Sequence, residues 1–296
     1  MKIGIFGMGA VGCAIYNELN GYNDLYVLAN NERLEKYKSG FIINDKLIVP
    51  NCSNNLKVDL LIVAVKNYHL EKSLKDIEKF VGPNTIILPL LNGIMAHDII
   101  QNHFKDNNVL YGVINVEANK IGNVVHTSKI INLQFGEEYN NPIKGYLKEI
   151  DSIFKKYNVN HNIYEDMKRR VWLKWMLNMG INQISALLNA TYKEMTHPYI
   201  LDIMFKIFDE VYNVSKAYNI NLDDNDLEYT KNMCKNFTSN RVTSLTIDFY
   251  NNKENELDSF SKTLIDLAYK KNILVPTNEL IYKLLKALYD NKNQKD

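Results

Sequence analysis

The sequence predicts an α/β domain built on a mostly parallel sheet, followed by a second domain made only of helices. Three observations support this prediction. An apolar strand at residues 3–6 runs directly into a glycine-rich turn and a helix-compatible segment. Strand-like and helix-like segments then alternate as far as residue 164, the pattern of a parallel sheet with crossover helices. From residue 165 the apolar spacing is almost entirely helical, so the expected domains are 1–164 and 165–296, and 296 residues suffice for two cores.

The glycine-rich turn has the spacing of a dinucleotide-binding loop. Gly7 permits the tight turn off the strand, Gly9 lets the backbone approach a pyrophosphate, and Gly12 lets the next helix pack closely on the sheet. The N-terminal amides of that helix would face the anion. The strand before the turn and the helix after it supply the context that such a motif needs. The candidate cofactor contacts are Gly7, Met8, Gly9, Ala10, Val11 and Gly12.

The other elements of the first domain follow from short apolar runs. Strands after the first are expected at 25–29, 60–65, 85–88 and 109–114. Residues 41–49 have the pattern of a small hairpin that turns at Asn44-Asp45, outside the main sheet. Two antiparallel strands, a helix and a last strand complete the domain, at 124–126, 130–135, 143–157 and 159–163.

Helical periodicity in the second domain gives segments near 166–189, 197–218, 224–237, 244–272 and 277–291. In the fourth region, Asn255 is placed to cap a helix, with Asp258 three residues later completing a capping pattern. Glu256 then falls in the first helical turn. By these local rules Glu256 is only an acid at a helix start.

Composition narrows the class of protein. A net charge of +1 provides no sustained basic field, so neither nucleic acid nor an anionic membrane surface is an expected partner. The three cysteines are widely separated and lack CxxC spacing, which argues against a disulfide framework and against a metal site. The chain starts directly with a core strand, and its apolar runs are shorter than the ~20 residues of a membrane span. A soluble, cytoplasmic protein is therefore expected.

The helix predicted at 166–189 is apolar nearly all round except for one polar row. Lys174, Asn178 and Asn182 recur at every fourth residue, which places them on one face. A solvent-exposed face would also be polar, but it is usually broad and charged, whereas this row is narrow and flanked by tryptophan, methionine and leucine. A cavity wall explains the row better. A lysine in such a wall is partly desolvated, which lowers its pKa and suits it to donate a proton in carbonyl reduction.

Two further polar residues follow predicted strands. Lys66 ends the run Val63-Ala-Val-Lys66, and Asn92 ends Leu88-Pro-Leu-Leu-Asn92. Ligands of open parallel sheets bind at the carboxyl ends of the strands, so both side chains are candidates for cofactor or substrate contacts. The alternatives are an exposed charge for Lys66 and a simple turn at Asn92-Gly93.

Taken together, these segments resemble the ketopantoate reductase family over essentially the whole chain. The matching segments are Gly7-x-Gly9-x-x-Gly12, Ala29-x-x-Glu-Arg33-Leu34, Val63-Ala-Val-Lys66, Leu91-Asn92-Gly93, Trp172-x-Lys174-x-x-x-Asn178-x-x-x-Asn182, Ser244-x-x-x-Asp248 and Asn255-Glu256-Leu-Asp258. The resemblance implies a Rossmann-type domain joined to a helical domain like the C-terminal domain of 6-phosphogluconate dehydrogenase. It also implies an oxidoreductase that reduces 2-dehydropantoate to pantoate with NADPH, in the pathway to pantothenate and coenzyme A.

By the same resemblance, Lys174 would be the general acid. The substrate-contact positions of the family match Asn92, Asn178, Asn182, Ser244 and Glu256, and Glu256 would accept a hydrogen bond from the substrate hydroxyl. Asn92 and Glu256 also count among the expected cofactor contacts, and Lys66 matches a lysine near the nicotinamide.

The second strand departs from the family pattern. Family members often have Ala-Arg-Gly at its end, where the arginine meets the cofactor's 2′-phosphate, whereas this chain has Ala29-Asn30-Asn31. An acid that would bind the ribose of NAD is missing there too. Arg33 is the nearest cation, so NADP(H) is the expected cofactor, with Asn30 and Arg33 near its ribose.

Three alternatives stay open. One is a related 2-oxo-acid reductase on the same scaffold. Another is a protein that senses NADPH without turnover, although a sensor would not need a proton donor such as Lys174. The third is an opine-type dehydrogenase, but His97, His126 and His161 lie outside the segments that would supply its catalytic histidine. The expected partner is a small 2-oxo acid, and a homodimer is compatible with the sequence.

Overall fold

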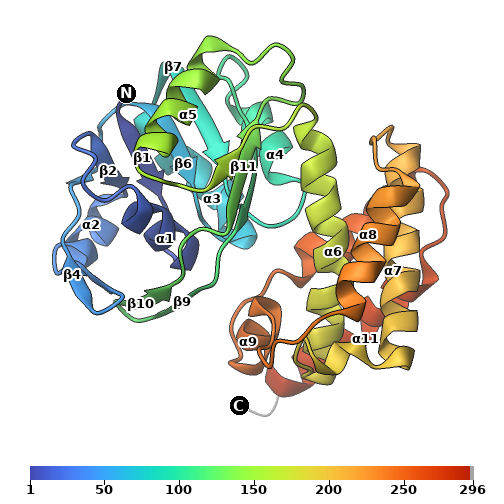
Figure 1. Ribbon diagram of the computed structural model, residues 1–296. Coiled ribbons are helices and arrows are strands. Elements are labelled where there is room, and N and C mark those ends of the chain that lie inside the picture. Colours follow the sequence, from blue (N-terminus) through green and yellow to red (C-terminus); the bar gives the residue numbers. More distant parts are fainter. Residues whose placement is uncertain (294–296) are drawn as a thin grey trace. The chain divides into compact units, whose positions relative to one another are not determined.

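The computed structural model of the protein describes residues 1–293 (Figure 1). The chain divides into two compact units, Met1–Val171 and Trp172–Asp296. The division falls within helix α6 (Met167–Leu188), and the predicted boundary at 164/165 lies just before this helix. The first unit is a Rossmann-like α/β unit and the second is helical, which confirms the predicted fold class.

The first unit is organised around a parallel sheet with strand order β5-β2-β1-β6-β7. These strands are β1 (Ile3–Phe6), β2 (Leu25–Leu28), β5 (Cys52–Ser53), β6 (Val58–Val63) and β7 (Val81–Pro89). The central strand β1 pairs in parallel with β2 and β6, with Phe6 opposite Leu28 on one side and Val63 on the other. These three strands therefore end at the same edge, where the loops that follow them come together.

Alternate residues of the sheet enter two different cores. Ile3 and Ile5 point to one face, which is covered by α1 (Ala10–Glu18) and α5 (Gly145–Lys156). Phe6 and Val63 point to the other face, which is covered by α3 (Asn67–Ile77) and α4 (Ala96–His103). A parallel sheet needs apolar residues on both faces for this reason. The central strand β1 is buried at every position, whereas the edge strand β5 is not.

Two smaller sheets flank the central one. The predicted hairpin forms from β3 (Phe41–Ile43) and β4 (Lys46–Ile48), and Asn44 and Asp45 both have positive φ, as a tight hairpin turn requires. It joins β10 (Val124–Thr127) and β9 (Ala118–Ile121) in the order β4-β3-β10-β9, outside the main sheet as predicted.

The strand predicted at 109–114 is only partly a strand of the main sheet. Val109 makes a parallel bridge to Ile87 of β7, but β8 (Tyr111–Asn115) then pairs antiparallel with β11 (Asn132–Gly136). Together with β12 (His161–Asn162) they form a third sheet with the order β12-β11-β8. The apolar run alone does not reveal this change of partner, because both kinds of pairing bury the same side chains.

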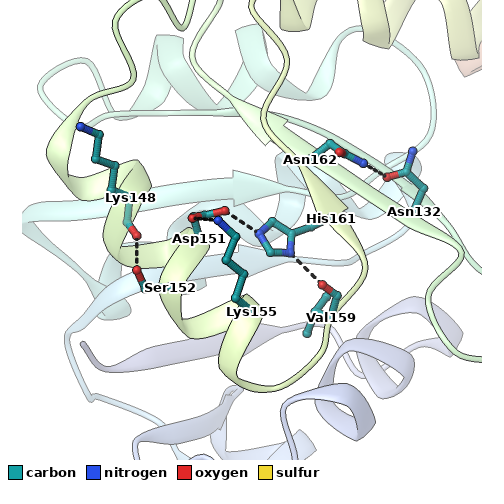
Figure 2. A network of polar contacts seen from close by, with 8 residues as sticks. All are labelled: Asn132, Lys148, Asp151, Ser152, Lys155, Val159, His161 and Asn162. Carbon is teal, nitrogen blue, oxygen red and sulfur yellow. Dashed lines mark hydrogen bonds and ion pairs between the residues drawn. The ribbon is translucent and has the colours of Figure 1, made fainter.

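A polar contact network ties α5 to β12 (Figure 2). His161 places Nε2 at 3.0 Å from Oδ1 of Asp151 and Nδ1 at 2.7 Å from the carbonyl oxygen of Val159. Lys155 donates a hydrogen bond to the other oxygen of Asp151 at 2.7 Å. The imidazole also packs against the rings of Phe135 and Phe154. The hydrogen bonds and the ring contacts together hold α5 against β12.

The second unit is built from helices that pack around α6. In addition to the part of α6 from Trp172 onward, it contains α7 (Pro198–Ala217), α8 (Asp224–Lys235), α9 (Ser244–Tyr250), a π-helical turn at Asp258–Lys262, α10 (Thr263–Lys270) and α11 (Pro276–Asn293). In this unit α6 is buried on several sides, since Trp175, Met179 and Ile184 all lie in the core. Among the described residues, no helix has both the length and the apolar character needed to cross a membrane.

The segment predicted as one helix at 244–272 is broken. It ends as α9 at Tyr250, and helical structure resumes only at Asp258. Asn255 does accept a backbone hydrogen bond, but from Leu257 at 3.1 Å rather than from Asp258. Residues 251–256 are all polar, so the apolar spacing is interrupted at the break and resumes only with Leu257.

Candidate functional site

The glycine loop between β1 and α1 has the geometry that a dinucleotide requires. Gly7 has a φ of 102°, and a Cβ at Gly12 would lie only 2.0 Å from the carbonyl oxygen of Gly7. Gly9 is different: it is exposed at the N-cap of α1, and a Cβ there would meet nothing closer than the carbonyl oxygen of Ala64 at 3.9 Å. Gly7 and Gly12 are thus required by the fold, whereas Gly9 leaves open space for a phosphate to approach.

A lysine that the sequence reasoning missed contacts this loop. Lys120 of β9 donates a hydrogen bond to the carbonyl oxygen of Met8, and its ammonium lies 4.6 Å from the centre of the Phe41 ring. Burial lowers the pKa of Lys120, and the nearby Arg33 lowers it further, against the effect of Cys13. Lys120 therefore holds the loop from an element far away in the sequence, and no local motif marks it.

The loops after β6 and β7 meet each other. Lys66 is the N-cap residue of α3, and the following Asn67 donates a side-chain hydrogen bond to the carbonyl oxygen of Asn92 at 2.8 Å. Both candidate residues, Lys66 and Asn92, are partly buried at this edge of the sheet. The neighbouring positions of β6 and β7 in the sheet explain why the two loops come together.

The end of β2 leads directly into α2 (Asn31–Tyr37). Asn30 caps this helix, and its side-chain oxygen accepts a hydrogen bond from the backbone of Arg33 at 3.1 Å. Arg33 is exposed on α2. Asn30 also donates to the carboxylate of Asp76 at 3.2 Å, so its amide connects α2 to the end of α3.

The polar row Lys174, Asn178 and Asn182 lies on the continuous helix α6, as the spacing predicted. The first two side chains are partly buried and Asn182 is 7% exposed, which is unlike a broad solvent-facing surface. The next residue along the chain, Gln183, belongs to a separate structural network: it donates to the carbonyl oxygen of Met179 at 2.8 Å.

Lys174 has the electrostatic environment expected of a proton donor. Burial of its ammonium lowers its pKa to about 8, although the carboxylate of Glu256 acts in the opposite direction and raises it. Glu256 is 6% exposed and lies in the break between α9 and the π-helical turn. Two residues far apart in the sequence are thus coupled electrostatically within the second unit, which local rules for Glu256 did not reveal.

Ser244 is the first residue of α9 and is exposed. The start of α9 is fixed to α6 through buried hydroxyl groups, because Ser185 lies 2.7 Å from Thr246, which lies 2.9 Å from Thr243. Ser185 also donates to the carbonyl oxygen of Ala190 at 2.7 Å. This network positions Ser244 relative to the polar row on the same unit.

The predicted site residues thus fall into two sets. The glycine loop, Asn30, Arg33, Lys66 and Asn92 belong to the first unit, and Lys174, Asn178, Asn182, Ser244 and Glu256 to the second. The first set offers backbone amides and cations, which suit the phosphates of a dinucleotide. The second offers an ammonium of lowered pKa and several amides, which suit proton transfer to a polar substrate.

Comparison with known families assigns both units. The family model for ketopantoate reductase PanE/ApbA matches residues 3–138, and the model for the C-terminal part of ketopantoate reductase PanE/ApbA matches residues 166–289. This chain belongs to the ketopantoate reductase family. It is an oxidoreductase of that family, and the predicted resemblance is confirmed.

The individual relatives and solved structures that are similar to this chain share only a low sequence identity with it. A 2-dehydropantoate 2-reductase of Streptococcus pyogenes serotype M6 is 26% identical over 77% of this chain and 78% of its own length. A D-mandelate dehydrogenase, solved with NADH and anilino(oxo)acetate, superposes with a TM-score of 0.88 at 20% identity, over 99% and 100% of the two chains. A dimeric ketopantoate reductase from Staphylococcus aureus superposes with a TM-score of 0.84 at 19% identity, over 98% and 99%. The structural likeness establishes the fold.

Proposed function

We propose that this protein reduces the keto group of a 2-oxo acid with NADPH, and that the substrate is 2-dehydropantoate, which becomes pantoate. The observation that carries the proposal is the buried ammonium of Lys174, whose pKa is lowered to about 8 beside the carboxylate of Glu256. A lysine tuned in this way is a proton donor near neutral pH. The family to which the chain belongs supports the same class of reaction.

The reaction needs a hydride and a proton. A bound nicotinamide supplies the hydride to C2 of the 2-oxo acid. The ammonium of Lys174 stabilises the negative charge that develops on the carbonyl oxygen and donates the proton that makes it a hydroxyl. The neutral amine that remains regains a proton from solvent, which its pKa of about 8 permits at neutral pH.

The other polar residues have orienting roles in this proposal. Glu256 accepts a hydrogen bond from the hydroxyl group of 2-dehydropantoate, which fixes the carbonyl relative to the hydride donor. Asn92, Asn178, Asn182 and Ser244 supply amide and hydroxyl groups to the substrate. Lys66 and the glycine loop Gly7–Gly12 bind the cofactor through its nicotinamide end and its pyrophosphate, respectively.

The experiment is a test of turnover over a panel of substrates. The purified protein is mixed with NADPH and 2-dehydropantoate, 2-oxobutyrate, 2-oxoisovalerate or phenylglyoxylate, and the loss of reduced-cofactor absorbance is followed. The proposal expects 2-dehydropantoate to have the highest kcat/KM. Turnover of a different 2-oxo acid alone would retain the reaction class and overturn the substrate, and binding of NADPH without turnover of any of them would favour a sensing protein.

A second candidate substrate class rests on a specific neighbour. The D-mandelate dehydrogenase that superposes on this chain was solved with NADH and an aryl-substituted oxo acid. An aromatic 2-oxo acid such as phenylglyoxylate is therefore the sharpest competitor in the panel. The dimeric Staphylococcus aureus relative supports a homodimer for this chain as well, which light scattering tests directly.

A further inference from the structure

The carbonyl group of Met8, inside the glycine loop, is held by two donors from other elements. The ammonium of Lys120 in β9 donates a hydrogen bond to the Met8 oxygen, and the thiol of Cys13 in α1 donates to the same oxygen at 3.6 Å. A carbonyl oxygen has two lone pairs and can accept both bonds at once. The bond from the lysine is the stronger one, because it is charge-assisted and a thiol is a weak donor.

The fold of the first unit directs Lys120 toward the loop. Lys120 pairs with Val125 in the four-stranded sheet β4-β3-β10-β9, and Val125 is fully buried. Because opposed residues of an antiparallel pair share a face, the side chain of Lys120 leaves this sheet on its core-facing side. Its ammonium lies 4.6 Å from the centre of the Phe41 ring on the same sheet. Packing therefore places the ammonium at the loop.

The position of the Met8 oxygen determines where the next backbone amide points. Within the described part of the chain, the only cis peptide bond precedes Pro142, so the bond between Met8 and Gly9 is trans. In a planar trans peptide the C=O and N–H bonds point in opposite directions. The amide of Gly9 is therefore directed away from Lys120 and Cys13.

The amide of Gly9 is available to a ligand. Gly9 is exposed at the N-cap of α1, and none of the residues that the structure describes accepts a hydrogen bond from its amide. A backbone N–H is a strong donor, and amides at the start of a helix suit an anion. The direction of this one donor thus depends on what holds the carbonyl of Met8.

We propose that Lys120 is a positioning residue for the cofactor, which holds the carbonyl of Met8 so that the amide of Gly9 points toward the pyrophosphate. The inference rests on the proposed use of a nicotinamide dinucleotide. Without Lys120 only the weak thiol bond restrains the peptide between Met8 and Gly9, and rotation of that peptide presents a carbonyl oxygen to the phosphates. NADPH and NADH share the pyrophosphate, so Lys120 contributes to the affinity for both and not to the choice between them.

Binding of three ligands to the full chain tests this role without any turnover. NADPH and NADH contain the pyrophosphate, whereas 2′-AMP contains the adenosine and a phosphate but no pyrophosphate. Each ligand is titrated by calorimetry into the wild type and into Lys120→Met, Lys120→Arg and Lys46→Met. Lys46 is the matched control, because it is an exposed lysine of β4 in the same four-stranded sheet. Circular dichroism checks that each variant is folded.

We expect Lys120→Met to weaken NADPH and NADH by the same factor, about 5–30-fold, which is the size of a hydrogen bond from a charged group. Binding of 2′-AMP should stay within about twofold, since it makes no use of the Gly9 amide. Lys120→Arg keeps a charged donor and should recover most of the affinity for both dinucleotides. Lys46→Met should change nothing.

A second measurement follows the Gly9 amide itself and needs only the wild-type protein. In amide proton NMR spectra, titration with NADPH or with inorganic pyrophosphate should move the Gly9 amide proton downfield, as expected when it donates to a phosphate oxygen. In Lys120→Met the shift at saturation should be smaller, because fewer molecules present this amide to the ligand.

The outcomes separate this inference from the proposed function. The inference is overturned if Lys120→Met binds both dinucleotides as the wild type does, or if it weakens 2′-AMP by the same factor, which would mean a general effect on the fold. A Gly9 amide proton that does not respond to either ligand overturns it as well. Each of these results leaves 2-oxo-acid reduction standing. If the wild type binds neither dinucleotide, the proposed function fails together with this inference.

Discussion

The carboxylate of Glu256 raises the pKa of the Lys174 ammonium, while burial lowers it by more, so that the lysine has a pKa of about 8. The two residues come from different elements of the second unit, the helix α6 and the break before the π-helical turn. Burial alone would favour the neutral amine, which cannot donate a proton to a carbonyl oxygen. The buried carboxylate keeps enough of the lysine in the ammonium form for proton transfer near neutral pH.

Replacing Lys174 tests the proton donor. Lys174→Ala should lower kcat by about 10²–10⁴-fold, as expected for loss of a general acid, with cofactor binding largely unchanged. Steady-state kinetics on the best substrate and titration with NADPH give both values. Lys206→Ala, which removes an exposed lysine of α7, serves as the control and should leave kcat as it is. Near-normal turnover of Lys174→Ala would mean that the proton comes from elsewhere.

The pH profile tests the charged pair. Reduction needs the ammonium form of Lys174, so kcat/KM should fall as the pH rises through about 8. In Glu256→Gln the raising effect of the carboxylate is gone, so this fall should begin at a lower pH. Glu254→Gln is the matched control, because Glu254 is exposed two residues away. An alkaline limb that stays in place or moves upward in Glu256→Gln would contradict the pairing.

Substitutions at Gly9 and Gly12 of the glycine loop should have different effects, the first on cofactor binding and the second on stability. Gly9→Val fills space that the protein itself leaves open, so it should weaken NADPH binding by about tenfold or more, or ~1.4 kcal/mol, with an unchanged melting temperature. Gly12→Ala drives a methyl group against the carbonyl oxygen of Gly7 and should reduce the free energy of unfolding by about 1–3 kcal/mol. Titration and thermal unfolding distinguish the two. Undiminished affinity in Gly9→Val would remove the loop from the cofactor site.

The network around His161 predicts a pH-dependent stability of the first unit. Burial opposes ionisation of Asp151, but hydrogen bonds from Lys155 and His161 outweigh it and lower the pKa of the carboxyl. A carboxyl with a lowered pKa stabilises the fold above its unfolded-state pKa, and this stability is lost as the pH falls through the folded pKa.

Asp151→Asn should therefore cost about 1–2 kcal/mol of unfolding free energy near pH ~6 and less near pH ~2, because the wild-type carboxyl loses its charge as the pH falls through its lowered pKa. Urea unfolding at both pH values measures the difference. Asp202→Asn breaks an exposed pair on α7 and should cost no more than about 0.5 kcal/mol at either pH. An equal loss for Asp151→Asn at both pH values would show that the effect is packing and not charge.

Several features of this protein could be predicted from its sequence because each depends only on residues that are close together in the chain. The strand before Gly7 and the helix that begins at Ala10 are specified by apolar spacing and by glycines within a dozen residues, and the order of strands and helices follows in the same way. The polar row from Lys174 to Asn182 is a matter of helical period on one element. Even the hairpin turn at Asn44-Asp45 depends only on two residues that tolerate positive φ.

The sequence by itself thus determined the fold class, the glycine loop and the polar face of α6, whereas the tertiary structure alone decided which distant residues act on them. Glu256 is an ordinary helix-start acid until the chain breaks after Tyr250 and places its carboxylate near Lys174. The contacts of Lys120 with the glycine loop and of Asp76 with Asn30 at the end of β2 arise likewise from separate elements. The physical reason is that periodicity reports which side of its own element a residue faces, while the packing of elements against one another determines what it meets there.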